Sequence, residues 1–389
     1  MNSKVKGAIA GLGLTKQGKI YGKTSRDFAV EAIKLALDDA GLKKTDLDGI
    51  MISQGMASRM GAPGVCGLDI QDALGLTDLN LLSIVDAYGS TLGQTVQYAA
   101  GAISGGLAEV IAIVYSDAPL VGGASAGASF SMTGVASGIA GLSTAAGILG
   151  APTMYAMAAT EHMTKFGTTS QQLGAIALSG RKWAMMNPHA VVRKPMTMED
   201  HQASRYVAEP LHLLDCCMVN NGGGAIIMTS PERARDLKQP PVYVIGWGQG
   251  HPGMSRSDKL LVTGAVDSGK RAMQMAGITT KDVNVCEIYD CFTITTLVTL
   301  EDYGFCKKGE GGAFVADGKL APGGSLPTNT GGGQLSGYYM MGMTPLTEAV
   351  IQARGQGGER QVPKHDIVLV SGNGGLLDYH STLVLTKHA

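Results

Sequence analysis

The chain lacks an excess of charge of either sign. Its 389 residues include 31 lysines and arginines against 32 aspartates and glutamates. A protein that binds nucleic acid or an anionic membrane through its overall charge carries a clear basic surplus. The balance therefore argues against both as the main partner.

Cysteine is also scarce and shows no metal-binding pattern. The six cysteines form no Cys-x-x-Cys pair and have no Cys/His spacing typical of a metal site. We therefore expect no metal site, and unpaired thiols in a reducing compartment. The adjacent Cys216 and Cys217 are interpreted as small buried residues. Residues 1–10 lack a charged-then-apolar signal sequence with a cleavage site, which predicts a cytoplasmic protein.

Charged residues are absent between positions 118 and 160. This stretch is rich in Gly, Ala, Ser and Thr and has no run of about 18 strongly apolar residues, so it does not fit a membrane span. We interpret it as a packed loop region that lines a pocket or a subunit interface.

Glycine is abundant instead. The chain has 56 glycines, about twice the usual share of roughly 7%, and many fall at predicted strand ends, where glycine allows close approach to a ligand. The chain is long enough to bury two cores. We predict two fused lobes, residues 1–240, with a loop region at 118–215, and residues 241–389.

A short pattern recurs at an offset of 236 residues. In the first copy a predicted amphipathic helix at 25–40, with Ser25 as a candidate N-cap, ends at Gly41 and leads to a strand. In the second copy a helix ends at Gly277 and leads to a strand near 283. A gapless recurrence of this kind indicates an internal duplication.

Strands alternate with helices in both halves. Strands are predicted at 7–11, 109–115 and 366–370, with helices at 96–104 and 345–354. Helical crossovers of this length connect parallel strands. The sequence therefore predicts an α/β protein with largely parallel sheets, whose two halves form a layered α/β/α/β/α arrangement.

The segment at 283–292 is the candidate site. It begins as a short apolar strand, ends at the polar residues Glu287, Tyr289 and Asp290, and is followed by helical spacing over 292–302. Ligands of α/β proteins bind beyond the carboxyl ends of strands. We therefore expect this turn to border a ligand site.

The duplicated layout, the sequence Glu-Ile-Tyr-Asp-Cys-Phe at 287–292 and the glycine-rich segment 326–342 resemble the thiolase superfamily. The likeness is greatest to the sterol carrier protein X and lipid-transfer-protein branch, and it covers essentially the whole chain. The resemblance implies a thiolase fold and an acyl-CoA substrate, with CoA as part of the substrate and no other cofactor.

The chain departs from that branch at its chemical positions. A thiolase of the branch has a nucleophilic cysteine at a helix N-terminus, which lowers the thiol pKa, and this position falls at or next to Gly89. The resemblance places Tyr289, and either Tyr338 or Tyr339, where the branch has histidines, and Ser371 where it has its last cysteine. An acyl-enzyme needs a thiolate, so ordinary thiolysis is not expected.

A retro-aldol reaction needs no covalent intermediate. Removal of the hydroxyl proton of a 3-hydroxyacyl-CoA lets the C2–C3 bond break, and the reaction requires a base, donors at the thioester oxygen and an acid. The chain resembles members of the branch that are aldolases shortening steroid or bile-acid side chains. We predict a carbon–carbon lyase that releases a ketone or aldehyde plus acetyl-CoA or propionyl-CoA, with Tyr289 and Tyr339, or Tyr338, as base and acid.

Further residues are candidates for the substrate pocket or for CoA binding, although a structural role fits many of them equally. The pocket candidates are Tyr88, Gly89, Ser90, Asp290, Cys291, Asn329, Gly331, Gly332, Ser371 and Gly372. The candidates for the CoA phosphates are Arg193, Lys194 and Arg256, each of which also fits a solvated surface.

Two other functions stay open on the sequence. An acyltransferase or thiolase could use a displaced cysteine, with Cys291 as the candidate, and a non-catalytic subunit could bind acyl-CoA. By resemblance, we also expect a homodimer that joins a small partner subunit, built from a zinc ribbon and an OB-fold, in a heterotetramer.

Overall fold

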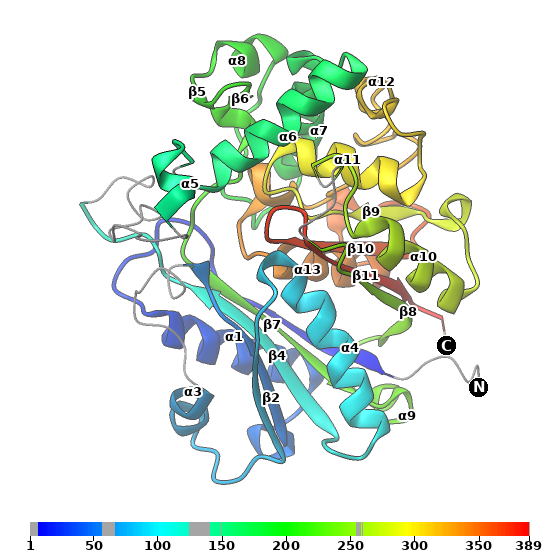
Figure 1. The fold of residues 1–389 in the computed structure, drawn as a ribbon. Coiled ribbons are helices and arrows are strands. Elements are labelled where there is room, and N and C mark those ends of the chain that lie inside the picture. Colours follow the sequence, from blue (N-terminus) through cyan, green and yellow to red (C-terminus); the bar gives the residue numbers. More distant parts are fainter. Residues whose placement is uncertain are drawn as a thin grey trace.

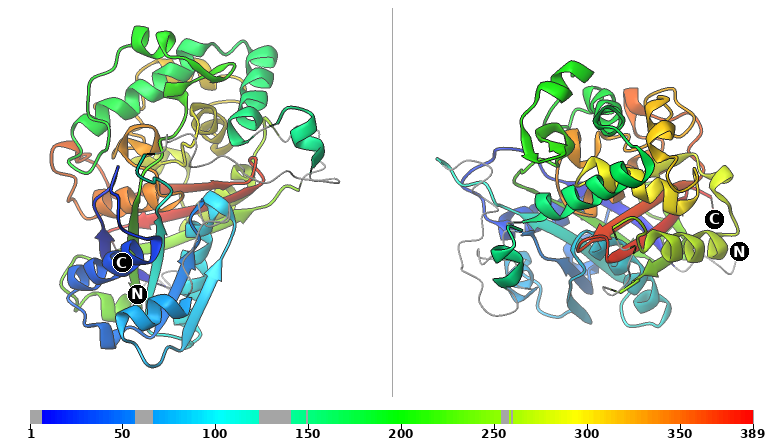
Figure 2. Two further views of the ribbon diagram at one scale, coloured as in Figure 1. Left: turned by 90° about the vertical axis from the view of Figure 1, so that its left-hand side faces the viewer. Right: turned by 45° about the horizontal axis from the view of Figure 1, so that its top comes forward.

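The computed structural model describes residues 7–56, 67–123, 141–148, 150–253, 258 and 260–388. Two halves share one central sheet, and extra helices cover one end of it (Figures 1 and 2). The first half consists of β1 (Ala8–Leu14), α1 (Ser25–Ala40), η1 (Lys44–Asp46), β2 (Gly49–Ser53), α3 (Gly67–Leu74), β3 (Leu81–Val85), η2 (Tyr88–Ser90), α4 (Thr91–Ser104), β4 (Val110–Asp117) and β7 (Gly222–Thr229).

The second half follows a short helix, α9 (Pro231–Ala234). It consists of β8 (Val242–Gly250), α10 (Ala265–Ala276), η6 (Thr280–Asp282), β9 (Val285–Glu287), α11 (Thr293–Tyr303), α12 (Gly311–Ala316), η7 (Gly333–Gly337), α13 (Met343–Ala353), η8 (Gly358–Arg360), β10 (Val368–Gly374) and β11 (Tyr379–Thr386).

The order of the strands in the nine-stranded central sheet shows the duplication. From the contact between β1 and β8 outward, the order is β1-β7-β4-β2-β3 in one half and β8-β11-β10-β9 in the other. The expectation of largely parallel sheets is wrong: only β2 with β3, β2 with β4, and β9 with β10 pair in parallel. The last strand of each half returns antiparallel between the first strand and the parallel ones.

The repeat detected in the sequence is confirmed at the level of helix ends. α1 ends at Ala40 and α10 at Ala276, and each is followed by a glycine in the left-handed region, with φ of 73° at Gly41 and 72° at Gly277. The 3-10 turns η1 and η6 then keep the same offset. The N-cap of α1 is Thr24 and not the predicted Ser25, because Thr24 Oγ1 accepts from Asp27 N while the Asp27 carboxylate accepts from Thr24 N.

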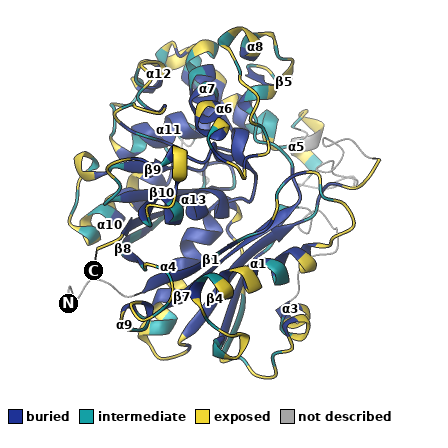
Figure 3. Ribbon diagram, turned by 180° about the vertical axis from the view of Figure 1, so that it is seen from behind, coloured by how far each residue is buried: buried dark blue, intermediate teal, exposed yellow. Residues whose placement is uncertain are grey.

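The core lies between the sheet and the helices of each half. α4 and α13 pack against the inner strands, whereas α1 and α10 cover the other face of their halves. α13 is buried along nearly its whole length, and burial is concentrated in the strands and central helices (Figure 3). A helix whose side chains are apolar on all sides, or have their polar atoms hydrogen-bonded, lies in the interior of a large protein.

The predicted loop region at 118–215 is largely helical where the structure describes it. It forms α5 (Gly141–Ala145), α6 (Ala151–Phe166), α7 (Ser170–Met185), α8 (Met198–Ala203), the strand pair β5 (Tyr206–Ala208) and β6 (Leu211–His212), and η5 (Leu213–Asp215). α6 and α7 pack against α11, at the top of Figure 1. Among the described residues, no helix combines the length and hydropathy needed to cross a bilayer.

Candidate active site

Gly89 lies at the turn η2 that leads into α4, and its surroundings leave no space for a side chain. A Cβ atom added to Gly89 would overlap the ring of Tyr289 and the carbonyl oxygen of Asn373. The tyrosine ring therefore fills the volume into which a nucleophilic side chain at this position would project. The neighbouring Ser90 is buried, and its hydroxyl accepts a hydrogen bond from Gln94 Nε2 at 3.0 Å.

Tyr289 and Tyr339 are brought together from segments 50 residues apart. Their hydroxyl oxygens lie 3.5 Å from each other, and both side chains are buried. Tyr338 is directed elsewhere: its hydroxyl lies 3.0 Å from Thr347 Oγ1. Tyr338 has an extended backbone with φ −161° and ψ 159°, in which consecutive side chains point in opposite directions. Of the two adjacent tyrosines, Tyr339 is the one that faces Tyr289.

Burial keeps both phenols neutral. Loss of solvation raises the pKa of Tyr289 well above its ordinary value, and the nearby Tyr339 raises it further. Loss of solvation likewise raises the pKa of Tyr339, with the nearby Cys217 adding to the shift and the hydrogen bond with Tyr289 opposing it. Near pH 7 neither group is a phenolate, so neither is by itself a ready-made base.

Tyr155 is a third tyrosine of this cluster, which the sequence reasoning missed. It lies on α6, its hydroxyl donates to the Gly375 carbonyl at 2.8 Å, and its ring stacks on Phe292 with centroids 4.6 Å apart. Burial raises its pKa, and Cys291 and Tyr339 add to the shift. One signal was available, because Tyr155 is the only tyrosine in the uncharged stretch at 118–160.

Asp290 and Cys291 follow Tyr289 in the predicted turn, and both are buried. Asp290 is buried, accepts from the Gln334 backbone N at 2.8 Å, and its carboxylate fills the space beside Gly333 at the start of the π-helical turn η7. Burial raises the pKa of Asp290 to about 7, opposed by backbone hydrogen bonds such as that from Gln334. Burial also raises the pKa of the Cys291 thiol strongly, which disfavours the thiolate that a nucleophile needs.

The glycine-rich loop is attached to the turn by backbone and amide contacts. Asn329 adopts a left-handed conformation with φ of 53°, and its Oδ1 accepts from Ile288 N at 2.7 Å. The Gly331 carbonyl accepts from Asn187 Nδ2 at 2.8 Å, and Gly332 has φ of 94° against Ala184. These three candidates build and hold the loop that carries Tyr339.

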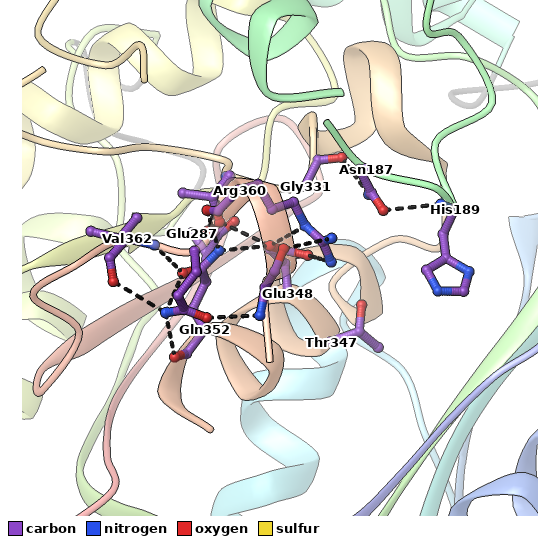
Figure 4. A network of polar contacts seen from close by, with 12 residues as sticks. Asn187, His189, Glu287, Gly331, Thr347, Glu348, Gln352, Arg360 and Val362 are labelled. Carbon is purple, nitrogen blue, oxygen red and sulfur yellow. Dashed lines mark hydrogen bonds and ion pairs between the residues drawn. The ribbon is translucent and has the colours of Figure 1, made fainter. Parts of the chain in front are cut away.

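A buried network of carboxylates lies behind the turn (Figure 4). Glu287 accepts from Thr330 N at 3.1 Å, and the Thr330 hydroxyl lies 2.7 Å from Glu287 Oε1 and 3.0 Å from Glu348 Oε1. Arg360 makes two bonds to Glu348, at 2.9 and 3.1 Å. The Thr330 hydroxyl has one proton and can donate it to only one of the two carboxyl groups, so the second contact requires a proton on the other carboxyl group. Burial and the nearby Glu348 raise the pKa of Glu287, which favours its protonated form.

The Ser371 side chain is engaged with β11. Its hydroxyl lies 2.9 Å from His380 Nε2, in a separate buried cluster that also contains Tyr303. The neighbouring Gly372 faces α4, because an added Cβ would lie 2.8 Å from the Gly89 carbonyl. The residue of β10 whose carbonyl touches Gly89 is Asn373, which the sequence reasoning did not select.

The candidate CoA residues lie on the segment after α7. Val191 N and Val192 N donate to the carbonyls of Gly337 and Ser336, so this segment runs along the glycine-rich loop. Arg193 and Lys194 follow and are exposed. Arg181 of α7 is buried, and its Nε donates to Ser336 Oγ at 2.8 Å. Arg256 lies outside the described residues.

Tyr88 is exposed beside Gly89, with φ of 51°, and its ring lies 6.5 Å from that of Tyr379. Within the described ranges, no group of three or more His, Cys, Asp or Glu side chains is placed to hold a metal ion. The site is thus a buried tyrosine cluster at the start of α4, next to Gly89, which the resemblance to thiolases assigns to the nucleophile position.

Comparisons with known proteins place this fold and site in a class. Residues 246–387 match the thiolase C-terminal domain-like family. The steroid side-chain-cleaving aldolase of Thermomonospora curvata is 35% identical over 94% of this chain and 95% of its own length. The 17-hydroxy-3-oxo-4-pregnene-20-carboxyl-CoA lyase of Mycobacterium tuberculosis is 37% identical over 94% of this chain and 96% of its own length.

A solved structure titled Ltp2-ChsH2(DUF35) aldolase superposes with a TM-score of 0.86 at 34% identity, covering 98% of each chain. The fold is therefore that of the thiolase superfamily, as expected. Within it, the chain belongs to the family of the steroid side-chain-cleaving aldolases. This confirms the predicted class of carbon–carbon lyase.

Proposed function

We propose that this protein cleaves a bulky 3-hydroxyacyl-CoA, with a steroid or similar skeleton, by a retro-aldol reaction that releases a ketone or aldehyde and acetyl-CoA or propionyl-CoA. The contact between the hydroxyls of Tyr289 and Tyr339 carries the proposal. It lies where a thiolase would hold its cysteine, at the start of α4. The names of the two relatives, one an aldolase for steroid side chains and one a pregnene-carboxyl-CoA lyase, support the substrate class.

The proton balance of the reaction suits two neutral phenols in contact. Cleavage breaks the C2–C3 bond, leaves its electron pair on C2 as the enolate, and converts the C3 hydroxyl to a carbonyl. One proton moves in total, from the hydroxyl oxygen to C2. One tyrosine takes this proton while it passes its own to the second, and the second protonates C2.

This relay begins and ends with both phenols neutral. It therefore avoids the free phenolate that burial of Tyr289 and Tyr339 disfavours. No cofactor is required beyond the CoA of the substrate. We place the CoA phosphates near Arg193 and Lys194, because these exposed cations follow the segment that lies along the glycine-rich loop.

The proposed assembly is a homodimer that joins a small zinc-ribbon and OB-fold subunit in a cytoplasmic heterotetramer. Support for a partner comes from the solved relative, whose title names the second component ChsH2(DUF35). The alternative of an acyltransferase with a displaced cysteine is disfavoured by the raised pKa of Cys291.

The test is the Tyr289→Phe variant of the full chain with its partner. We expect turnover of the 3-hydroxyacyl-CoA to fall by roughly 10²–10⁴ while the melting temperature is retained. Tyr243→Phe is the control, since Tyr243 is a buried tyrosine of β8 packed in another cluster. Undiminished turnover in Tyr289→Phe would remove the proposal, and a covalent acyl adduct on Cys291 would favour the acyltransferase.

A further inference from the structure

We propose that Asn373 is the residue that recognises the C3 hydroxyl of the substrate, and that Tyr155 fixes the Asn373 amide for this contact. The inference rests on the proposed function, because it concerns the same site. It assigns to Asn373 the selection of hydroxylated over unhydroxylated acyl-CoA, which the tyrosine pair alone does not explain.

Asn373 borders the reacting centre. It lies near the end of β10 and is only 1% exposed. Its carbonyl oxygen and the Tyr289 ring both occupy the space next to Gly89. Its side chain reaches Tyr155, whose pKa is affected by Tyr339 and Cys291 and which therefore belongs to the same cluster.

Tyr155 determines which way the amide points. The single hydroxyl proton of Tyr155 is donated to the Gly375 carbonyl at 2.8 Å. Its oxygen can then only accept, and the group that faces it at 3.5 Å must be the Nδ2 donor of Asn373. The opposite orientation would bring two acceptors together, so Oδ1 is directed away from Tyr155.

Oδ1 of Asn373 is buried and has no hydrogen-bond partner within the part of the chain that the structure describes. A buried acceptor left without a donor destabilises the protein, so we take an acceptor of this kind in an enzyme site to await a donor that arrives with the ligand. Around the reacting carbons, a 3-hydroxyacyl thioester offers one donor, the C3 hydroxyl, since the thioester group only accepts. In the bound substrate this hydroxyl donates to Oδ1 of Asn373, and it rotates about its C–O bond to donate to the tyrosine when the C2–C3 bond is cleaved.

A site that hydrogen-bonds a substrate hydroxyl rejects the analogue that lacks it, because its own polar group then stays unpaired. The two probes are accordingly a 3-hydroxyacyl-CoA and the acyl-CoA of the same skeleton without the hydroxyl. Binding is measured by calorimetry in the full chain carrying Tyr289→Phe, so that turnover does not interfere. Asn373→Leu, of similar volume and without polar atoms, is added to this background.

We expect the Tyr289→Phe protein to prefer the hydroxylated ligand by at least roughly tenfold, and Asn373→Leu to reduce the preference to within about twofold without changing the affinity for the unhydroxylated ligand. Tyr155→Phe in the same background should weaken the preference, whereas Tyr243→Phe should keep it. A preference that persists in Asn373→Leu overturns the inference. Equal weakening of both ligands also overturns it, since the contact would then be to the shared CoA.

The failure of the proposed function looks different. In that case the unsubstituted protein does not cleave the 3-hydroxyacyl-CoA, whichever of the two ligands the Tyr289→Phe protein binds. If instead the unsubstituted protein cleaves its substrate and Asn373→Leu retains the hydroxyl preference, only the role of Asn373 is wrong. Because Tyr155→Phe leaves Asn373 unchanged, it tests the inference even where Asn373→Leu lowers the melting temperature.

Discussion

The ring of Tyr289 occupies the space that a side chain at Gly89 would need. The loss of a nucleophile and the gain of a tyrosine are therefore one structural change, because either side chain excludes the other. A thiolase cysteine cannot be restored at this position by a single substitution.

The first prediction concerns this close packing. Gly89→Ala should lower the free energy of unfolding by about 1–3 kcal/mol, the usual cost of overpacking a filled interior. The control is Gly101→Ala in α4, the helix that follows η2, where an added Cβ meets open space and should stabilise the helix by roughly 0.5–1 kcal/mol. Denaturant unfolding measures both, and equal effects at the two positions would contradict the packing described for Gly89.

The second prediction separates two adjacent tyrosines. Tyr339→Phe removes the hydroxyl that faces Tyr289 and should lower kcat by roughly 10²–10⁴. Tyr338→Phe removes only the contact with Thr347 and should cost about 0.5–1.5 kcal/mol of stability with turnover retained. Steady-state kinetics and thermal unfolding of the two variants are the measurements. A larger kinetic effect at Tyr338 would reverse the assignment.

The third prediction is a pH dependence caused by Asp290. Its pKa is raised by burial to about 7 in the folded protein, against about 3.9 in an unfolded chain. The folded state therefore retains a proton that the unfolded state has lost, and this contribution to stability disappears as pH rises from about 4 to about 7. The unfolding free energy of the unsubstituted protein should fall more steeply over this window than that of Asp290→Asn. Parallel curves for the two proteins would show that Asp290 does not titrate as described.

The fourth prediction uses the two carboxyl groups that share Thr330. The raised pKa favours a neutral Glu287, so Glu287→Gln is an isosteric neutral replacement and should change stability little. Glu348 is paired with Arg360, and Glu348→Gln leaves a buried cation without its partner, which should cost about 3–5 kcal/mol. Chemical denaturation ranks the two variants. The opposite ranking would place the proton on Glu348.

The sequence by itself determined the features that depend on neighbouring residues. The glycines that end α1 and α10, the turns that follow and the strand before Tyr289 are local patterns, so their recurrence at a fixed offset was visible without coordinates. The missing cysteine at Gly89 and the tyrosines near 289 and 339 could also be read directly. Together with the resemblance to the thiolase superfamily, these observations predicted the fold class and the class of reaction.

Only the tertiary structure decided which side chains meet. Tyr339 faces Tyr289, and Tyr338 does not, because neighbouring residues of an extended segment point to opposite sides. The Asn373 carbonyl lies against Gly89 and the Ser371 hydroxyl contacts His380, because the path of β10 depends on its pairing with β9 and β11. Tyr155 arrives from a helix more than a hundred residues from the turn. Contacts over such separations are fixed by packing, which no local pattern encodes.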